Sequence, residues 1–260
     1  MNKLKNFPIV NFPNVWGEIE RLNFMMEQCD RYKIQANPFK IDRYENIKEN
    51  ILIESKCDLA EGSPGINISF LELMKQWYDR GDEQYGLFCD DDSSFESFDY
   101  WNFTWQDFLD HLPNDWQCIQ LIRCNHWNPD HYWKYYKEEI PSLKFRTRNW
   151  DDWGSSFLCK RSYVKKIIDR YIIGKHHYNM NIVDPTGAWS YYYPIIENLL
   201  FQNIGIVYNF PIILENQNLL SSNWFRKNNP EYNKLSYEYY SRLWIEQGKN
   251  FSIQQLMLED

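Results

Sequence analysis

A short apolar run stops abruptly at three consecutive aspartates in the segment Q-Y-G-L-F-C-D-D-D-S-S-F-E-S-F (84–98). An apolar run of this length, Tyr85 to Phe88, predicts a buried β-strand with Asp90–Asp92 at its carboxyl end. In open α/β sheets, ligands bind just outside the carboxyl ends of the strands. Three adjacent carboxylates repel one another unless a cation lies among them. The segment therefore predicts either a site for Mg²⁺ or Mn²⁺ carrying a diphosphate, because hard oxygen ligands suit these ions, or an Asp-rich turn before the next helix.

Strand patterns and helix patterns alternate through the first half of the chain, which predicts a parallel or mixed sheet covered on both faces. The predicted strands are residues 7–12 (ended by Pro13), 34–41, 85–88, 116–122, 157–159 and 206–210. The predicted helices are residues 16–32, 44–56, 63–81, 103–111, 164–172 and 194–203, with a further one near the end of the chain. The expected fold class is α/β, a single domain over residues 1–225 with a helical extension over 226–260.

Composition excludes some classes of function. The formal charge is −8 and no long basic run is present, so binding to nucleic acid is disfavoured. The six cysteines form no CxxC pair, which indicates reduced thiols in the cytoplasm, and no apolar segment predicts a membrane span. The chain holds 12 Trp, 19 Tyr and 16 Phe, which fill cores and also make flat surfaces for sugars or bases. The aromatic stretch 126–136, with Trp189 and residues 191–193, is interpreted as an acceptor platform or as core or dimer packing.

Several motifs occur in a consistent order: I-V-N-F (9–12) with Arg21 in the helix behind it, G-I-N-I-S-F-L-E-L (65–73), Asp90–Asp92, L-P-N-D-W-Q-C-I-Q-L (112–121), W-G-S-S-F-L-C-K-R-S-Y-V-K-K-I-I (153–168) and P-I-I-E-N-L-L-F (194–201). Together these motifs resemble the family 25 glycosyltransferases, the lipooligosaccharide-biosynthesis and procollagen galactosyltransferase group. The resemblance implies a GT-A fold and transfer of a hexose from a nucleotide sugar, UDP-Glc or UDP-Gal, to a hydroxyl acceptor on a glycan or protein. Two positions depart from the family pattern, since Asp90 stands in place of Glu and Glu197 in place of Asp, and residues 125–150 have no match.

The resemblance implies a role for each acidic residue of the run. Asp90 and Asp92 are the expected metal and donor ligands, because alternate side chains of an extended chain share a face. Asp91 would then face the other way, toward the sugar hydroxyls, or act as a turn cap. A metal at this place would stabilise the leaving diphosphate.

Further residues receive roles from the same resemblance. Glu197, in the first turns of its helix, is the expected base of an inverting reaction, with Asp184 as second choice, although an ordinary acidic residue at a helix start explains Glu197 nearly as well. Asn11 and the loop after it are expected near the nucleotide base, and Arg21 is expected to be structural or to face the pyrophosphate. Trp153 and Gly154 are expected to shape the donor-sugar pocket, with core packing as the alternative for Trp153.

Two other functions remain open at this point. A Mg²⁺-dependent nuclease or phosphotransferase also uses clustered carboxylates, but it needs a basic residue beside them, and residues 82–110 contain no Lys or Arg. A glycan-binding protein with the same fold and no turnover is the third possibility. Donor hydrolysis, measured as free UDP, separates these functions.

Overall fold

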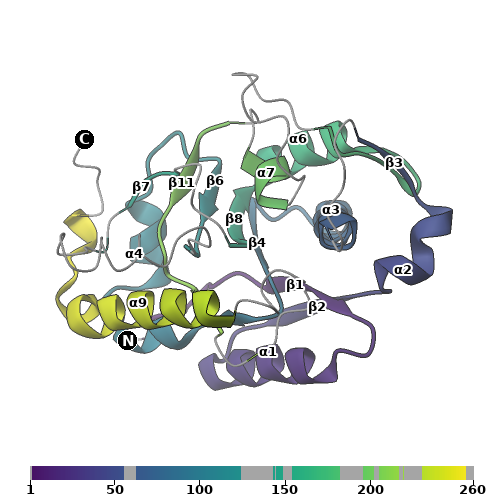
Figure 1. The fold of residues 1–260 in the computed structure, drawn as a ribbon. Helices are drawn as coiled ribbons and strands as arrows, with labels where there is room; N and C mark the ends of the chain where they lie inside the picture. Colours follow the sequence, from purple (N-terminus) through teal and green to yellow (C-terminus); the bar gives the residue numbers. More distant parts are fainter. Residues whose placement is uncertain are drawn as a thin grey trace.

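The main sheet has seven strands and an α/β architecture (Figure 1). The computed structural model describes residues 2–55, 63–123, 143, 145–148, 154–181, 196–201, 205–216, 219 and 230–255. β8 and β7 run antiparallel to their neighbours, and the remaining pairs are parallel, so the sheet is mixed and mostly parallel. The strand order is β2 (Ala36–Ile41), β1 (Val10–Val15), β4 (Tyr85–Cys89), β8 (Ser156–Lys160), β6 (Cys118–Gln120), β11 (Val207–Asn209) and β7 (Arg146–Thr147).

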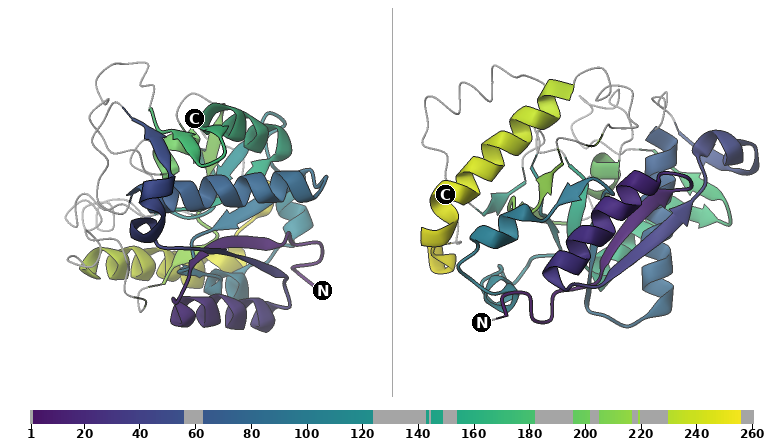
Figure 2. Two further views of the ribbon diagram at one scale, coloured as in Figure 1. Left: turned by 90° about the vertical axis from the view of Figure 1, so that its right-hand side faces the viewer. Right: turned by 90° about the horizontal axis from the view of Figure 1, so that it is seen from below.

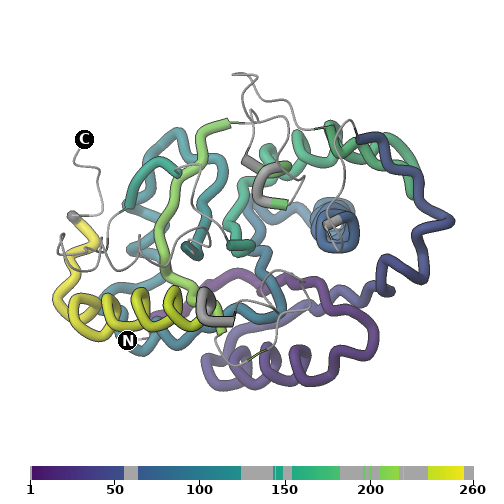
Figure 3. Tube along the Cα trace, in the orientation of Figure 1, coloured from purple at the N-terminus to yellow at the C-terminus, as the bar shows by residue number. Residues whose placement is uncertain are grey.

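Helices cover both faces of this sheet, as predicted. One face packs against α1 (Ile19–Tyr32), α4 (Trp105–Asp110) and α9 (Pro230–Gln247), and the other packs against α3 (Ser63–Arg80), α6 (Arg161–Tyr171) and α7 (Ile196–Phe201). In the left view of Figure 2, β1 runs between α1 and α3. In Figure 3, α9 is the long yellow helix, and it packs against the short strand β12 (Leu214–Glu215) and the short helix η2 (Glu96–Tyr100).

Strand side chains alternate strictly between the two cores. In β4, Leu87 and Cys89 join the α1 side, while Phe88 joins the α3 side. In β8, Leu158 joins the α1 side and Phe157 the α3 side. This is the period-two pattern of a sheet buried on both faces, and it explains why the sequence shows continuous apolar runs at these strands.

Two small sheets and several short helices complete the described structure. One small sheet contains β3 (Leu52–Glu54), β10 (His177–Asn179) and β9 (Ile172–Gly174), and the other contains β5 (Ser93–Ser94) and β12 (Leu214–Glu215). The prediction of one helix over 44–56 was wrong, because residues 52–54 pair in parallel with β10, far away in sequence. The short helices are α2 (Tyr44–Ile47), η1 (Lys48–Asn50), η2, η3 (Gly248–Asn250) and η4 (Ile253–Gln255).

β1 continues through Pro13, where the sequence predicted its end. The Val10 amide donates to the Gln35 carbonyl, directly before β2, and the Trp16 amide donates to the Ile41 carbonyl at the end of β2. Even-numbered residues of β1 therefore point their N–H groups toward that strand. Pro13 therefore faces β4, and the β1–β4 ladder has already ended at the Asn11–Phe88 pair. Because no hydrogen bond is due at this position, the missing N–H of proline costs nothing.

Within the described residues, no helix is long and apolar enough to cross a membrane. The cysteines in these residues are buried and form no disulfide: Cys29, Cys89, Cys118 and Cys159.

Candidate functional site

Buried polar side chains gather at one edge of the main sheet. The carboxyl ends of β1, β4, β6 and β11 meet at this edge together with the amino end of β8, because β8 runs in the opposite direction. A strand interior that is otherwise apolar gives way here to groups that need hydrogen-bond partners. The buried polar residues at this edge are Asn14, Asp91, Asp92, Ser93, Gln120, Ser155, Ser156 and Asn209.

Asp90–Asp92 forms a tight turn between β4 and β5, which we call the acidic turn. The Asp90 amide donates to the Ser155 carbonyl over 2.8 Å, and the Ser93 amide donates back to the Asp90 carbonyl over 3.2 Å. The structure thus differs from the sequence argument, which treated the three residues as extended chain with alternating faces. In the turn, the side chains of Asp91 and Asp92 face the same partner.

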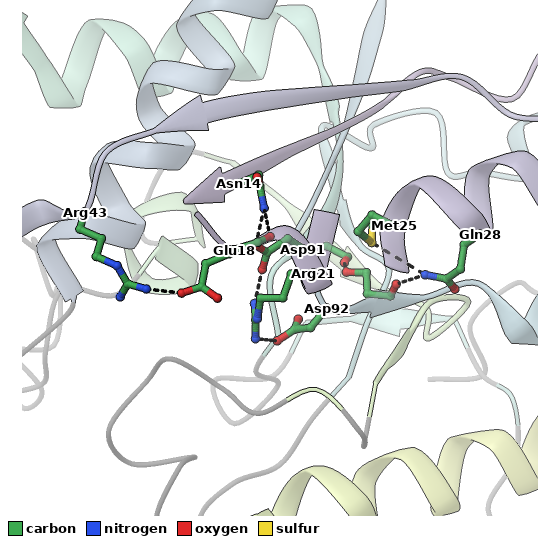
Figure 4. A network of polar contacts seen from close by, with 10 residues as sticks. Asn14, Glu18, Arg21, Met25, Gln28, Arg43, Asp91 and Asp92 are labelled. Carbon is green, nitrogen blue, oxygen red and sulfur yellow. Dashed lines mark hydrogen bonds and ion pairs between the residues drawn. The ribbon is translucent and has the colours of Figure 1, made fainter. Parts of the chain in front are cut away.

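That partner is Arg21, which reaches the acidic turn from the first turn of α1 (Figure 4). Its guanidinium donates to Asp91 through one nitrogen and to Asp92 through the other, the second contact measuring 2.9 Å. Asn14, near the end of β1, adds a long hydrogen bond to Asp91 at 3.5 Å. All three charged residues are nearly out of solvent, and their side chains are 11% (Arg21), 11% (Asp91) and 8% (Asp92) exposed.

Burial and neighbouring charges shift the pKa values of Arg21 and Asp91 in this cluster. Burial by itself would lower the pKa of Arg21, but the nearby carboxylates of Asp92 and Asp91 outweigh it and raise that pKa. Burial also raises the pKa of Asp91 to about 6, against the lowering effect of Arg21. One guanidinium faces three carboxylates, so the acidic turn keeps a net negative charge that attracts cations.

A second α1 residue, Gln28, holds the chain directly after the acidic turn. Its amide nitrogen donates to the Ser93 carbonyl over 2.8 Å, and its amide oxygen accepts from the Phe95 amide over 2.7 Å. Ile19, Leu22, Met26 and Cys29 recur at helical spacing in the sequence, which predicts an apolar inner face of this helix. Cys29 is buried and Leu22 and Met26 pack half-buried against the core, whereas Ile19 is 66% exposed. Arg21, Met25 and Gln28 join Cys29 on the buried face.

Sequence reasoning missed Gln28, because it used only the apolar spacing of this helix and the position of Arg21 in a motif. The available signal was the seven-residue spacing of two polar side chains, Arg21 and Gln28, around Met25. Residues seven apart lie on the same face of a helix, two turns from one another.

The other predicted site residues fall in different places. Asn11 lies early in β1, where its amide donates to the Leu87 carbonyl and accepts from Asn37, so its side chain links strands away from the acidic turn. Gly154 lies at the expected edge with φ of 112°, and its carbonyl accepts from Gln120 over 2.9 Å. Glu197 is the second residue of α7, and only its backbone is described. Asp184, Trp153, Trp189 and the stretches 126–136 and 191–193 lie outside the described residues.

The chemistry of the acidic turn fits a divalent cation by charge and by donor type. Carboxylate oxygens are the ligands that Mg²⁺ and Mn²⁺ prefer, and a net negative charge remains after Arg21 is counted. As placed, Asp91 and Asp92 each direct one oxygen to Arg21, and no three acidic, His or Cys side chains converge within the described residues. Asp90, the more exposed of the three, and the remaining oxygen of Asp92 are therefore the candidate donors.

A cleft of about 460 Å³ lies beside β5, the strand that follows the acidic turn. It lies between the outer face of α1, the β5 segment and α9, and acidic and amide side chains make up much of its wall. The lining includes Glu20, Asn23, Glu27, Ser94, Asn216 and Tyr237.

No protein-family model matches this chain, and no curated protein matches it significantly in sequence. The role of the acidic turn is therefore inferred from its own geometry and charge.

Proposed function

We propose that this chain is a glycosyltransferase that moves a hexose from a nucleotide sugar, UDP-Glc or UDP-Gal, to a hydroxyl acceptor on a glycan or protein. The observation that supports it is the acidic turn, fixed by Arg21 and placed at the carboxyl end of β4 in a mostly parallel sheet. Ligands of such sheets bind at this edge. The order of motifs along the chain, which resembles the family 25 glycosyltransferases, supports the same proposal.

Asp90 and Asp92 are the residues proposed to hold Mg²⁺ or Mn²⁺. Such an ion, when bound, would supply electrostatic stabilisation for the diphosphate that leaves from the donor. The ion pair between Arg21 and Asp91 holds the acidic turn in its orientation. Gly154, whose neighbour Ser155 accepts the hydrogen bond from the Asp90 amide, has a φ of 112°, a backbone conformation that favours glycine beside the acidic turn.

Glu197 is the proposed base, and Asp184 is the second candidate. An inverting transfer needs a carboxylate that removes the proton from the acceptor hydroxyl as the oxygen attacks the anomeric carbon. The aromatic stretch 126–136 remains the proposed acceptor platform.

A Mg²⁺-dependent nuclease or phosphotransferase is the second candidate, and one observation favours it. Arg21 supplies the basic residue that the sequence around the aspartates lacks. However, Arg21 directs its guanidinium to two carboxylates and is only 9% exposed. It is therefore placed to hold the acidic turn rather than to bind a substrate phosphate, and the transferase remains the better-supported function.

The decisive measurement is release of UDP from UDP-Glc and UDP-Gal in the presence of Mn²⁺. We expect Asp90→Asn to lower this release about 100-fold or more, since it removes a proposed ligand of the ion. Asp99→Asn, which changes an exposed aspartate in an ion pair with Arg31, is the matched control and should behave like the wild type.

Other outcomes point elsewhere. Hydrolysis of DNA or of phosphate esters that depends on Asp90, without release of UDP, would favour the phosphotransferase. Glycan binding without any turnover would favour the non-catalytic protein.

A further inference from the structure

We propose that Gln28 is a positioning residue of the donor site, and this inference rests on the proposed function. Gln28 touches no proposed substrate atom. It acts through the acidic turn, because it fixes the chain segment that follows Asp92.

Both ends of the Gln28 side-chain amide are hydrogen-bonded. Its side-chain amide uses its nitrogen on the Ser93 carbonyl, at 2.8 Å, and its oxygen on the Phe95 amide, at 2.7 Å. The side chain is 8% exposed and also contacts the sulfur of Met25 at 3.8 Å. A buried amide with both ends hydrogen-bonded adopts one orientation, because turning it over would pair donor with donor and acceptor with acceptor.

The geometry matches that of a neighbouring strand. Along an extended chain, the carbonyl of one residue and the amide two residues later point to the same side. Ser93 and Phe95 present such a pair on one edge of β5, and the Gln28 amide completes it. The opposite edge of β5 pairs with β12, in the register Leu214–Ser94. On the second edge of β5, the Gln28 side chain therefore supplies the hydrogen bonds that a neighbouring strand would make.

Both ends of the acidic turn are held as a result. Before the turn, β4 is embedded between β1 and β8. After the turn, β5 is held by β12 on one edge and by Gln28 on the other, and the Ser93 hydroxyl meets the Ser156 hydroxyl at 2.9 Å. Arg21, which lies on the same face of α1 as Gln28, binds the carboxylates of Asp91 and Asp92. This arrangement leaves Asp90 little freedom to change its direction.

A purely structural role would make a different prediction. The α1 face already contains Met25 and Cys29, which are fully buried, and a further apolar side chain would pack there equally well. Replacing Gln28 by Met keeps the length and apolar packing but removes both hydrogen bonds. If Gln28 only fills space, Gln28→Met leaves the donor site unchanged.

The test compares Gln28→Met with the wild type and with Gln106→Met, an exposed glutamine that contacts Asp110 on α4. We expect Gln28→Met to speed hydrogen exchange at the Phe95 amide at least tenfold, because that amide loses its acceptor. We expect the affinity for UDP with Mn²⁺, measured by calorimetry, to fall about tenfold. The kcat of hexose transfer should fall up to about 100-fold, the scale set by ångström displacements in active sites, while the acceptor KM stays unchanged.

Gln28→Glu provides a second variant should Gln28→Met fold poorly. It keeps the acceptor for the Phe95 amide but loses the donor to Ser93, so exchange at Phe95 should stay slow while UDP affinity still falls. The inference is overturned if either folded variant binds UDP with Mn²⁺ as tightly as the wild type does. If the wild type itself binds no nucleotide diphosphate, the proposed function fails instead. Hydrogen exchange at the Phe95 amide then still shows whether Gln28 holds β5.

Discussion

Arg21 is nearly buried, and a guanidinium taken out of water is costly unless carboxylates compensate for it. Here Asp91 and Asp92 do so from the same turn, the latter at 2.9 Å, with side chains 11% and 8% exposed. Removing a single partner of such a cluster costs more than removing the whole cluster, because the remaining charge stays buried. We therefore expect Arg21 to be far more sensitive to substitution than Arg31, the other arginine of α1.

Arg21→Met should lower the free energy of unfolding by about 3–5 kcal/mol, since it leaves two buried carboxylates without a counter-charge. Arg31→Met is the matched control on the same helix, because Arg31 and Asp99 are 56% and 45% exposed. Exposed ion pairs contribute at most about 1 kcal/mol, so this control should change little. Urea unfolding followed by circular dichroism measures both. Equal losses in the two variants would contradict the role given to the Arg21 cluster.

Helix starts show how much of an element is decided locally. α4 begins with a capping box, in which Thr104 accepts from the Asp107 amide over 3.0 Å and Asp107 accepts from the Thr104 amide over 2.8 Å. Both partners lie three residues apart, so the sequence alone specifies this start. α1 is different, because its buried face depends on partners 70 residues away.

The capping box of α4 should make stability depend on pH. Hydrogen bonds from the side chain and backbone of Thr104 hold the pKa of Asp107 below its usual value. Because the folded pKa lies below the unfolded one, about 3.9, the contribution is present above the unfolded pKa and is lost as pH falls through the folded pKa. Thr104→Ala should therefore cost about 1 kcal/mol at pH 7 and progressively less below about pH 4.

Urea unfolding of the wild type and Thr104→Ala at pH 7 and pH 3 measures this difference. Thr147→Ala, an exposed threonine in β7, is the control and should show no such dependence. A Thr104→Ala deficit that is the same at both values of pH would show that the Asp107 carboxylate does not contribute.

The whole molecule is held by two cores, one on each face of the main sheet, and α9 closes the core on the α1 side. Trp244 of α9 is fully buried, and its indole N–H donates to the Pro211 carbonyl over 2.7 Å. It packs against Phe251, which lies shortly after α9, and against aromatic side chains from distant segments: Trp101, Phe103 and Phe210. The C-terminal helix is therefore integral to the main core.

Trp244→Ala should destabilise the protein by about 3–5 kcal/mol, the cost of deleting a large buried aromatic side chain. Ile245→Ala removes the next residue of the same helix, which is 51% exposed, and should cost at most about 0.5 kcal/mol. Thermal unfolding followed by near-ultraviolet circular dichroism measures both variants. A loss of α9 structure in Trp244→Ala without any change in the rest of the molecule would show that the helix packs as a separate unit.

Local spacing in the sequence was enough to predict much of this protein. The apolar run before Asp90, the strand predicted at 157–159 and the helices predicted at 16–32 and 63–81 follow from periodicity and from capping or turn residues, which depend only on near neighbours, and they correspond to β4, β8, α1 and α3. The same reasoning correctly gave a mixed, mostly parallel sheet with helices on both faces. It also placed the aspartates at the carboxyl end of a strand.

Tertiary structure decided the rest, because the partners involved are far apart in sequence. Residues 52–54 became a strand only through β10, and β1 passes through Pro13 only because its ladder with β4 ends earlier. The acidic turn faces Arg21 rather than presenting alternating carboxylates, since turn geometry replaces extended geometry at residues 91–92. The polar face of α1 is buried because the acidic turn and β5 offer it charges and hydrogen bonds. Hydrophobic periodicity indicates which side chains are buried, but it does not indicate which polar groups become hydrogen-bond or ion-pair partners in the folded chain.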